Sequence, residues 1–182
     1  MRASGAGILL DACVVINLFA SRHMAAILDT APGPVAVADL VVAESLYVRR
    51  GGAGDDANEP EPVDLSPLIA TNRLSVLTAT DEELETFVDL TLDVDDGEAM
   101  TLALAIHRQA TVVTDDRKVK RALAGRAPLR STPDLIKDWA DQANVPEPVL
   151  RLALNDVQQR GSYLPGRTHP LRTWWDATLP PP

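Results

Sequence analysis

The sequence predicts an α/β fold built on one parallel sheet, and two features of the chain predict it. Short apolar runs alternate with longer stretches of helical periodicity along most of the chain, which is the pattern of successive β-α-β units. Hydrophobic residues make up 46% of the 182 residues and aromatic residues only 4%, so the core must consist of Ala, Val, Leu and Ile. Such aliphatic strands are typical of a parallel sheet covered by helices.

The first half of the chain contains three predicted strands and three predicted helical segments. The strands are expected at residues 8–10, 35–37 and 74–77. The helical segments are expected at residues 14–29 with a break, 40–49 after a cap at Asp39, and 66–71. Residues 51–62 are rich in Gly, Asp, Asn, Glu and Pro without apolar periodicity, which predicts a mobile surface loop.

The second half of the chain contains two further predicted strands and five predicted helices. The strands are expected at residues 111–114 and 128–131, and the helices at residues 82–92, 98–109, 116–124, 132–139 and 145–160. The first of these helices is expected to place Leu84, Phe87, Val88 and Thr91 on one packed face. The helix at 132–139 is expected to have Thr132 as its N-cap and Pro133 at its first position.

The Pro-rich end of the chain, residues 163–182, is expected to be irregular. Trp174 and Trp175 are expected to anchor part of it in the core, because buried aromatic side chains are more common than base-stacking ones. We therefore expect one domain, with residues 1–141 forming its main body and residues 142–182 a helical C-terminal extension packed on it.

Composition excludes several classes of protein. Cys13 is the single cysteine, so neither an internal disulfide framework nor a cysteine-based zinc site is possible. The apolar stretch at residues 8–20 is too short to span a bilayer and is interrupted by Asp11 and Asn17, so we expect a cytoplasmic protein with no membrane partner. The net charge of −9 argues against coating nucleic acid by bulk charge, but not against an enzyme that uses a cation and a local basic patch.

Acidic residues occur at four stations that a parallel sheet brings to one edge. Asp11 ends the first strand, and Asp115 and Asp116 follow the strand at 111–114. Glu44 lies in the helix after the second strand, and Glu98 opens the helix before the fourth. Ligands of open parallel sheets bind beyond the carboxyl ends of the strands. We therefore expect these carboxylates to lie close together.

A cluster of this kind predicts a bound divalent cation. Crowded carboxylates repel one another and take up protons, whereas Mg²⁺ or Mn²⁺ prefers oxygen ligands and needs only a few carboxylates because it retains several waters. Such a metal lowers the pKa of a bound water and neutralises charge on a phosphodiester. The residues thus favour metal-assisted hydrolysis. Glu98, Asp96 and Asp116 could each be only a helix cap, whereas Asp11 and Glu44 are embedded in apolar runs, where a carboxylate is costly unless it is paired.

Four segments of the chain resemble the PIN-domain nucleases, in particular their VapC-like toxin ribonucleases. The segments come in the order of that family, span roughly residues 8–139, and are fairly specific only as a set of four. They are Leu-Leu-Asp-Ala-Cys-Val-Val-Ile-Asn at 9–17, Val-Val-Ala-Glu-Ser-Leu-Tyr at 41–47, Asp-Gly-Glu-Ala-Met at 96–100 and Val-Val-Thr-Asp-Asp-Arg at 112–117. The resemblance implies a three-layer α/β/α PIN-like fold and RNA-cleaving activity that depends on Mg²⁺ or Mn²⁺.

The resemblance also implies which residues form the site. It implies catalytic carboxylates at Asp11, Glu44, Glu98 and Asp116. The metal ligands would be Asp11, Glu98 and Asp116, with Asp115 as the second choice for the last position and Asp96 assisting or substituting.

Other features near these acids concern substrate and partners. Asn17 matches a polar position of the family that steadies a ligand or water, and Cys13 stands where Ser, Thr or Asn is common, as a buried small residue and not a nucleophile. Arg117 and Lys118 are candidate contacts to RNA phosphates. The family further implies a homodimer and often an antitoxin protein that covers the active site.

Three other classes of protein share some of these features. A phosphatase of the haloacid dehalogenase type needs a second Asp where this chain has Cys13. A dinucleotide-binding domain needs glycines after the first strand, whereas Gly5 and Gly7 precede it. A catalytically inactive PIN-like protein that binds or scaffolds stays open.

Overall fold

The computed structural model describes residues 7–44, 46–52 and 55–179 of the chain. Its centre is a sheet of five strands in the order β5-β2-β1-β6-β7, and every neighbouring pair is parallel. The strands are β1 (Ile8–Leu10), β2 (Val35–Ala38), β5 (Ser75–Leu77), β6 (Thr111–Val113) and β7 (Leu129–Arg130). The expected parallel sheet is therefore confirmed.

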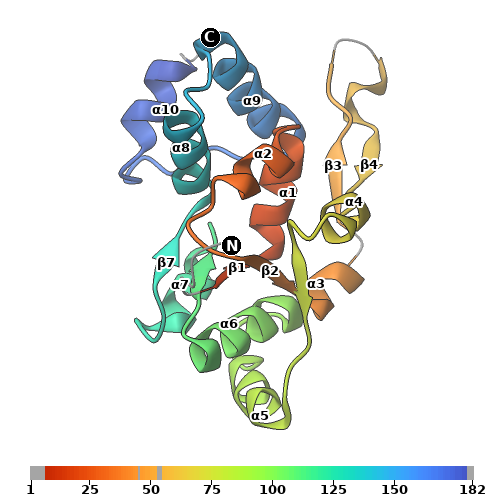
Figure 1. Ribbon diagram of the computed structural model, residues 1–182, viewed down its shortest axis with the longest axis vertical. Helices are drawn as coiled ribbons and strands as arrows, with labels where there is room; N and C mark the ends of the chain where they lie inside the picture. Colours follow the sequence, from red (N-terminus) through yellow and green to blue (C-terminus); the bar gives the residue numbers. More distant parts are fainter. Residues whose placement is uncertain (1–6, 45, 53–54, 180–182) are drawn as a thin grey trace.

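Helices cover both faces of this sheet and give the molecule three layers (Figure 1). On one face lie α5 (Asp81–Leu90), α6 (Asp96–Arg108) and α7 (Arg117–Leu123); on the other lie α1 (Ala12–Ala20), α2 (Met24–Asp29), α8 (Thr132–Gln142) and α9 (Glu147–Arg160). Two short helices, α3 (Asp39–Ala43) and α4 (Ser66–Ala70), flank the β2 and β5 side of the sheet.

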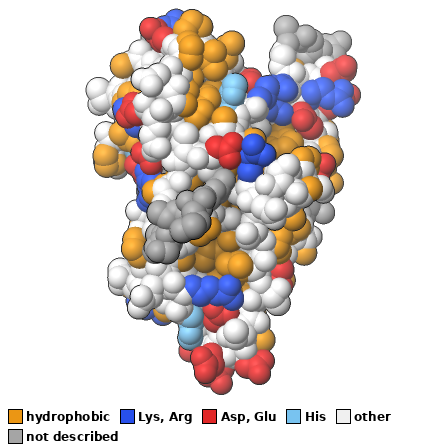
Figure 2. All heavy atoms as spheres, in the orientation of Figure 1, with side chains coloured by type: hydrophobic (Ala, Val, Ile, Leu, Met, Phe, Trp, Pro, Cys, Tyr) orange, Lys and Arg blue, Asp and Glu red, His pale blue; other side chains and the backbone are white. Residues whose placement is uncertain are grey.

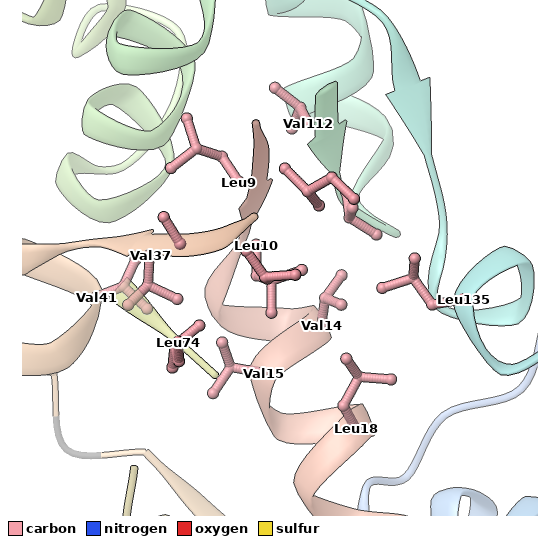
Figure 3. Packing of buried hydrophobic residues seen from close by; sticks show 14 of the residues in the cluster. Leu9, Leu10, Val14, Val15, Leu18, Val37, Val41, Leu74, Val112 and Leu135 are labelled. Atoms are coloured by element: carbon pink, nitrogen blue, oxygen red, sulfur yellow. The ribbon is translucent and has the colours of Figure 1, made fainter. Parts of the chain in front are cut away.

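The strand register places the ends of β1 and β6 side by side. Leu10 pairs with Val113, so the next residues, Asp11 and Thr114, follow their strands at the same level. Every residue of β1 is buried, as expected for a central strand with helices on both faces. Figure 3 shows Leu9 and Leu10 of β1 among the aliphatic side chains of α1 and the neighbouring strands.

A small antiparallel hairpin projects beside the main sheet and corrects two expectations (Figure 1). It consists of β3 (Tyr47–Arg49) and β4 (Pro60–Pro62), joined by a segment that includes a short 3-10 helix, η1 (Asp55–Asn58). The helix predicted at 40–49 is therefore wrong beyond Ala43, and the predicted loop at 51–62 contains a strand. Tyr47 and Arg49 are exposed while Val48 is buried. This alternation from one residue to the next is the pattern of a β-strand with one buried face.

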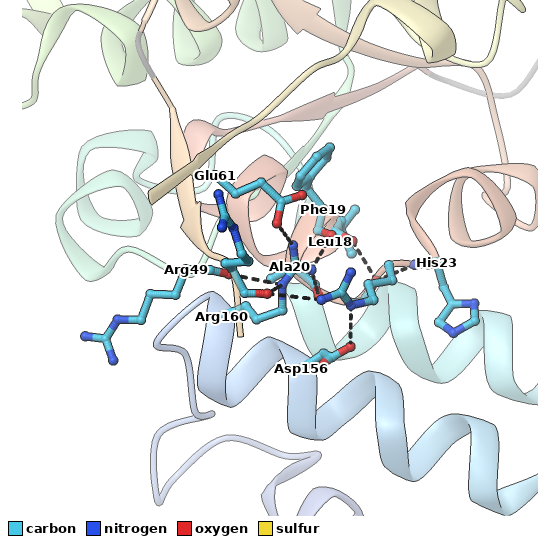
Figure 4. A network of polar contacts seen from close by, with 11 residues as sticks. Leu18, Phe19, Ala20, His23, Arg49, Glu61, Asp156 and Arg160 are labelled. Atoms are coloured by element: carbon cyan, nitrogen blue, oxygen red, sulfur yellow. Dashed lines mark hydrogen bonds and ion pairs between the residues drawn. The ribbon is translucent and has the colours of Figure 1, made fainter. Parts of the chain in front are cut away.

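The hairpin is held to the body by one buried guanidinium (Figure 4). Arg160, at the end of α9, has a side chain that is 1% exposed. Its Nη1 donates to the carbonyl of Ala20 at 2.6 Å, its Nε to the carbonyl of Arg49 at 3.1 Å, and its Nη2 to Glu61 Oε2 at 2.8 Å. The charge is thus buried with carbonyl acceptors and an ion-pair partner, as a buried arginine requires.

The end of the chain is more ordered than the sequence suggests. Residues predicted to be irregular include a helix, α10 (Arg172–Thr178). Trp175 is fully buried and meets Trp174 edge to face, with ring centroids 6.4 Å apart. The expected anchoring of this segment by Trp175 is confirmed, because burying an indole ring offsets the entropy lost when a Pro-rich segment becomes ordered.

Details at helix ends and faces also differ from expectation. Ser131, not Thr132, is the N-cap of α8, and it forms a capping box with Asp134. On α5, Leu84 and Val88 are 41% and 61% exposed. The face predicted to pack is therefore largely exposed, and α5 buries Glu83 and Leu90 instead.

Candidate active site

Asp11 lies at the carboxyl end of β1 with only 1% of its surface exposed. Its Oδ1 accepts from the backbone N–H of Ala12 at 2.8 Å, and its Oδ2 accepts from the hydroxyl of Thr114 at 2.6 Å and the thiol of Cys13 at 3.1 Å. Burial raises the pKa of Asp11, and these hydrogen bonds oppose that rise. The three neutral donors orient the carboxylate without neutralising it.

Cys13 serves Asp11 as a donor. Burial and the neighbouring carboxylate of Asp11 raise the pKa of its thiol, so the sulfur stays protonated at neutral pH. A protonated thiol is a poor nucleophile, which agrees with the expectation that Cys13 is not one.

Asp115 and Asp116 follow β6 and have different environments. Asp115 accepts four hydrogen bonds: from the amide of Asn17, the hydroxyl and backbone N–H of Thr132, and the hydroxyl of Tyr163. These bonds join α1, the start of α8 and the segment after α9 to one carboxylate. Asp115 is thus committed to contacts within the protein.

Asp116 is less engaged. It is the N-cap of α7, and one of its oxygens accepts from the backbone N–H groups of Lys118 and Val119. Its other oxygen has no hydrogen-bond partner among the described residues. Of the two aspartates considered for the last ligand position, Asp116 is the one with an oxygen left for a cation.

Asn17 is a positioning residue in the structure. It is 3% exposed, and its amide donates to Asp115 Oδ2 at 3.0 Å and to Thr132 Oγ1 at 3.3 Å. Its buried side chain supports Asp115; contact with substrate stays a prediction.

Glu98 enters the site from the first turn of α6. Asp95 is the N-cap of this helix, and the two residues form a capping box: Glu98 N donates to Asp95 Oδ1 at 2.9 Å, and Asp95 N donates to Glu98 Oε2 at 3.3 Å. Such reciprocal bonds fix both side chains. Burial, followed by the charge of Asp95, raises the pKa of Glu98 to about 7.

Asp95 is the acidic residue that sequence reasoning missed. Its charge raises the pKa values of Asp11, Glu44 and Glu98. Asp96, the predicted assisting ligand, is exposed and contributes to none of these shifts. The signal was present in the sequence, because an Asp three residues before a Glu at a helix start has the spacing of a capping box.

Glu44 completes the cluster from the end of α3, where it is the C-cap residue. Its side chain is not embedded in the core, as the apolar residues around it suggested; the residue is exposed. The carboxylate lies against Gly97 in α6, in the space that a Cβ there would need. Partial burial and the charges of Asp95 and Asp11 raise its pKa.

The structure therefore brings together five carboxylates, which we name the acidic cluster. Its members are Asp11, Glu44, Asp95, Glu98 and Asp116. Each is coupled electrostatically to at least one other, and in the part of the chain that the structure describes none forms an ion pair with Lys, Arg or His. No basic side chain among the described residues is therefore paired with the negative charge of the cluster.

The donor set of the acidic cluster fits a hard divalent cation. All its ligating atoms are carboxylate oxygens, which Mg²⁺ and Mn²⁺ prefer. Among the described residues, no three acidic, His or Cys side chains approach closely enough to form a ready-made metal site. Ligation by Asp11, Glu98 and Asp116 therefore requires these side chains to draw together around the ion.

The two predicted RNA contacts on α7 lie on different sides of that helix. Arg117 lines a cavity together with Lys120 and Asp115, whereas Lys118 lines another with Arg121 and Asp93. Elsewhere, on the face of the molecule in Figure 2, basic side chains are dispersed among acidic ones, and acidic side chains gather over α5.

Comparison with known proteins identifies the family. No curated protein and no solved structure matches the chain, and no helix in the described residues is both long and apolar enough to cross a bilayer. A family model described as a PIN domain matches residues 8–167. Because this match includes most of the 182 residues and the whole acidic cluster, the chain belongs to the PIN-domain family.

Proposed function

We propose that this protein is a metal-dependent endoribonuclease that hydrolyses RNA phosphodiesters. PIN domains are generally nucleases and generally use divalent metal ions. The observation that carries the proposal is the acidic cluster, which lies at the carboxyl edge of a parallel sheet without a compensating cation from the described residues. A cluster held together against its own repulsion is better explained by a ligand than by helix capping alone.

Asp11, Glu44, Glu98 and Asp116 are the proposed catalytic residues. Asp11, Glu98 and Asp116 would hold Mg²⁺ or Mn²⁺. Asp95 would assist them, with Asp96 as the alternative that the family resemblance favours. When bound, the ion would lower the pKa of a water and neutralise charge on the scissile phosphodiester.

The surrounding residues of this chain supply orientation. Thr114 and Cys13 hold one oxygen of Asp11 by neutral donors, which leaves its charge available. Asp95 fixes Glu98 through the capping box. Asp115 acts as a positioning residue, because its carboxylate accepts hydrogen bonds from three segments around the site. Such fixed side chains lower the cost of assembling a metal site.

Cleavage of a labelled RNA tests this proposal. The purified protein should cut RNA with Mn²⁺ or Mg²⁺, lose activity in EDTA, and lose it in Asp11→Asn. Asp81→Asn is the matched control, because Asp81 is an exposed acid at the start of α5, which lies beside the C-terminal end of α6 and not beside the cluster. If RNA is never cut under conditions in which the metal raises the melting temperature, the protein is an inactive PIN-like binding module. Cleavage that survives both EDTA and Asp11→Asn contradicts the mechanism.

A toxin role with an antitoxin partner is the finer form of this proposal, and the family resemblance supports it. Its cheapest test is genetic: a small open reading frame beside the gene, encoding a DNA-binding pattern, should suppress the growth defect that expression of this chain causes. Suppression should require the intact neighbour, and Asp11→Asn should abolish the growth defect.

A homodimer is proposed on one further observation. Leu84, Val88 and Leu92 follow at intervals of four residues along α5 and the turn after it, and they are 41%, 61% and 87% exposed. Residues four apart lie on one side of a helix, so they form an apolar stripe that a second copy could bury. Sedimentation should show a dimer that Val88→Glu dissociates, with Thr91→Glu beside the stripe as the control.

A further inference from the structure

A groove continues from the acidic cluster along the far side of α7. It has a volume of about 630 Å³ and lies between Arg117 and Lys120 of α7 and the segment 164–170, which follows α9. Asp115 and Tyr163 line its inner end. The same two residues line a neighbouring cavity of about 310 Å³ that contains Asp116, so the groove opens directly beside the cluster.

Three cations face this groove without a carboxylate partner. Arg117, Lys120 and Arg167 line it, and none of them forms an ion pair or a side-chain hydrogen bond with another described residue. Most arginines elsewhere in the structure are paired, for example Arg73 with Asp29 and Arg130 with Asp138. In a chain with a net charge of −9, three unpaired cations around one groove indicate an anionic ligand.

The carboxylate in the groove does not cancel this charge pattern. Asp115 keeps its charge, because its donors Asn17, Thr132 and Tyr163 are neutral, but it is one carboxylate against three cations in the lining. The second aspartate, Asp116, belongs to the acidic cluster. The groove lining therefore carries a net positive charge.

The outer wall of the groove is held in place by the body of the protein. His169 Nδ1 accepts from the backbone N–H of Leu171 at 3.0 Å, so its Nε2 carries the proton and donates to the hydroxyl of Ser131 at 2.9 Å. Arg172 donates to the carbonyl of Pro165 at 2.7 Å. These contacts hold the segment that carries Arg167 against the body of the protein, so the groove is formed without a ligand.

We propose that this groove binds the phosphates of single-stranded RNA on one side of the cut, with Arg117, Lys120 and Arg167 as the contacts. The inference rests on the proposed nuclease function and gives the C-terminal segment a part in substrate binding. A narrow positive groove follows the backbone of a single strand, and contacts from flexible cations to phosphates carry no base sequence. Lys118, the other predicted RNA contact on α7, lines a different cavity with Arg121 and Asp93, and its contact with RNA stays a separate prediction.

The test compares two double variants that each remove one Lys and one Arg. The groove pair is Lys120→Ala with Arg167→Ala. The control pair is Lys137→Ala with Arg151→Ala, whose side chains form ion pairs on α8 and α9 and do not line the groove. Binding of a fluorescein-labelled single-stranded RNA of mixed sequence is measured by anisotropy in EDTA, where metal-dependent cleavage does not interfere. Titrations run from about 50 to 200 mM salt, the range over which phosphate contacts change affinity most visibly.

The groove pair should weaken binding about tenfold and flatten the plot of log K against log salt by about 1.4, since each lost phosphate contact on a single strand contributes about 0.7. The control pair should stay near the wild type, and Arg167→Ala alone should show about half the change in slope. Equal losses in the two pairs, or no binding of RNA by the wild type, overturn the proposal. So does a groove pair that binds RNA normally but fails to bind an acidic polypeptide such as polyglutamate.

This readout is separate from catalysis. If the groove pair loses RNA affinity while the wild type cleaves nothing, the groove stands and the nuclease proposal fails. If the wild type cleaves RNA and the groove pair binds it as tightly, the groove proposal fails alone.

Discussion

The carboxylate of Glu44 lies against the Cα of Gly97, so that two segments more than fifty residues apart touch within the acidic cluster. Gly97 is buried in the first turn of α6 and has ordinary helical backbone geometry. A glycine is therefore needed here for the close approach of Glu44 and not for its backbone freedom.

Gly97→Ala is expected to abolish most activity while leaving the fold intact. The added methyl group would displace Glu44, yet alanine favours a helix over glycine by about 1 kcal/mol. We expect cleavage to fall at least about tenfold, a loss of roughly 1.4 kcal/mol in transition-state stabilisation, with a urea midpoint no lower than that of the wild type. The shorter Glu44→Asp in the same chain should restore part of the activity. Full activity in Gly97→Ala would show that Glu44 does not act from this position.

Asp95→Asn and Asp96→Asn form a matched pair of neighbouring substitutions. Asparagine is as good an N-cap as aspartate, so α6 should persist in both variants. Loss of the Asp95 charge should lower the pKa of Glu98 from about 7. It should also reduce metal-dependent cleavage, because Asp95 is a proposed assisting residue. Asp96→Asn should behave as the wild type. Titration of Glu98 by NMR and an RNA cleavage assay check the two effects, and a reversed order would restore Asp96 as the assisting ligand.

Asp115→Asn and Asp116→Asn should separate stability from activity. Asp115 accepts four hydrogen bonds, and an amide has only one oxygen to accept them, so its substitution should cost about 1–3 kcal/mol of unfolding free energy. Asp116→Asn keeps the cap of α7 and should unfold like the wild type but fail to cleave RNA. Urea denaturation and cleavage assays on both variants decide the matter. Equal stability of the two would contradict the assigned roles.

Glu83 predicts how stability changes in acid. Its carboxylate receives a double hydrogen bond from Arg108, at 2.7 and 2.9 Å, which lowers its pKa from 4.5 to about 2. The unfolded chain therefore binds this proton first as the pH falls, so the stabilisation present above about pH 4.5 is lost progressively toward pH 2. Glu83→Gln should remove this part of the pH dependence, measured by urea unfolding at several pH values. An unchanged acid profile would show that the pair contributes nothing.

The layers of the fold followed from local pattern, whereas the hairpin and α10 did not. The strand at Ile8–Leu10 is apolar enough, and the helix at Asp96–Arg108 long enough, to be predicted from the local sequence. The strand at Tyr47–Arg49 is stabilised by pairing with residues 60–62 and by Arg160 far along the chain. Because these partners are distant in sequence, the residues around Tyr47–Arg49 alone do not predict the strand.

The positions of the acidic residues could be predicted from the sequence, but the role of each one could not. Which of Asp115 and Asp116 points inward depends on Thr132 and Tyr163, which arrive from distant segments. The same holds for Arg167, because nothing in the order of residues 164–170 reveals that they run beside α7.

Arg160 sets a practical limit on shortening this protein. Its guanidinium serves carbonyl groups at the end of α1 and in the hairpin, together with Glu61. A truncated protein that ends after α8 would lack Arg160. The carbonyl oxygens would then lose the donor that they share, and Glu61 would lose its ion-pair partner. A shortened version of this protein should therefore keep α9 through Arg160.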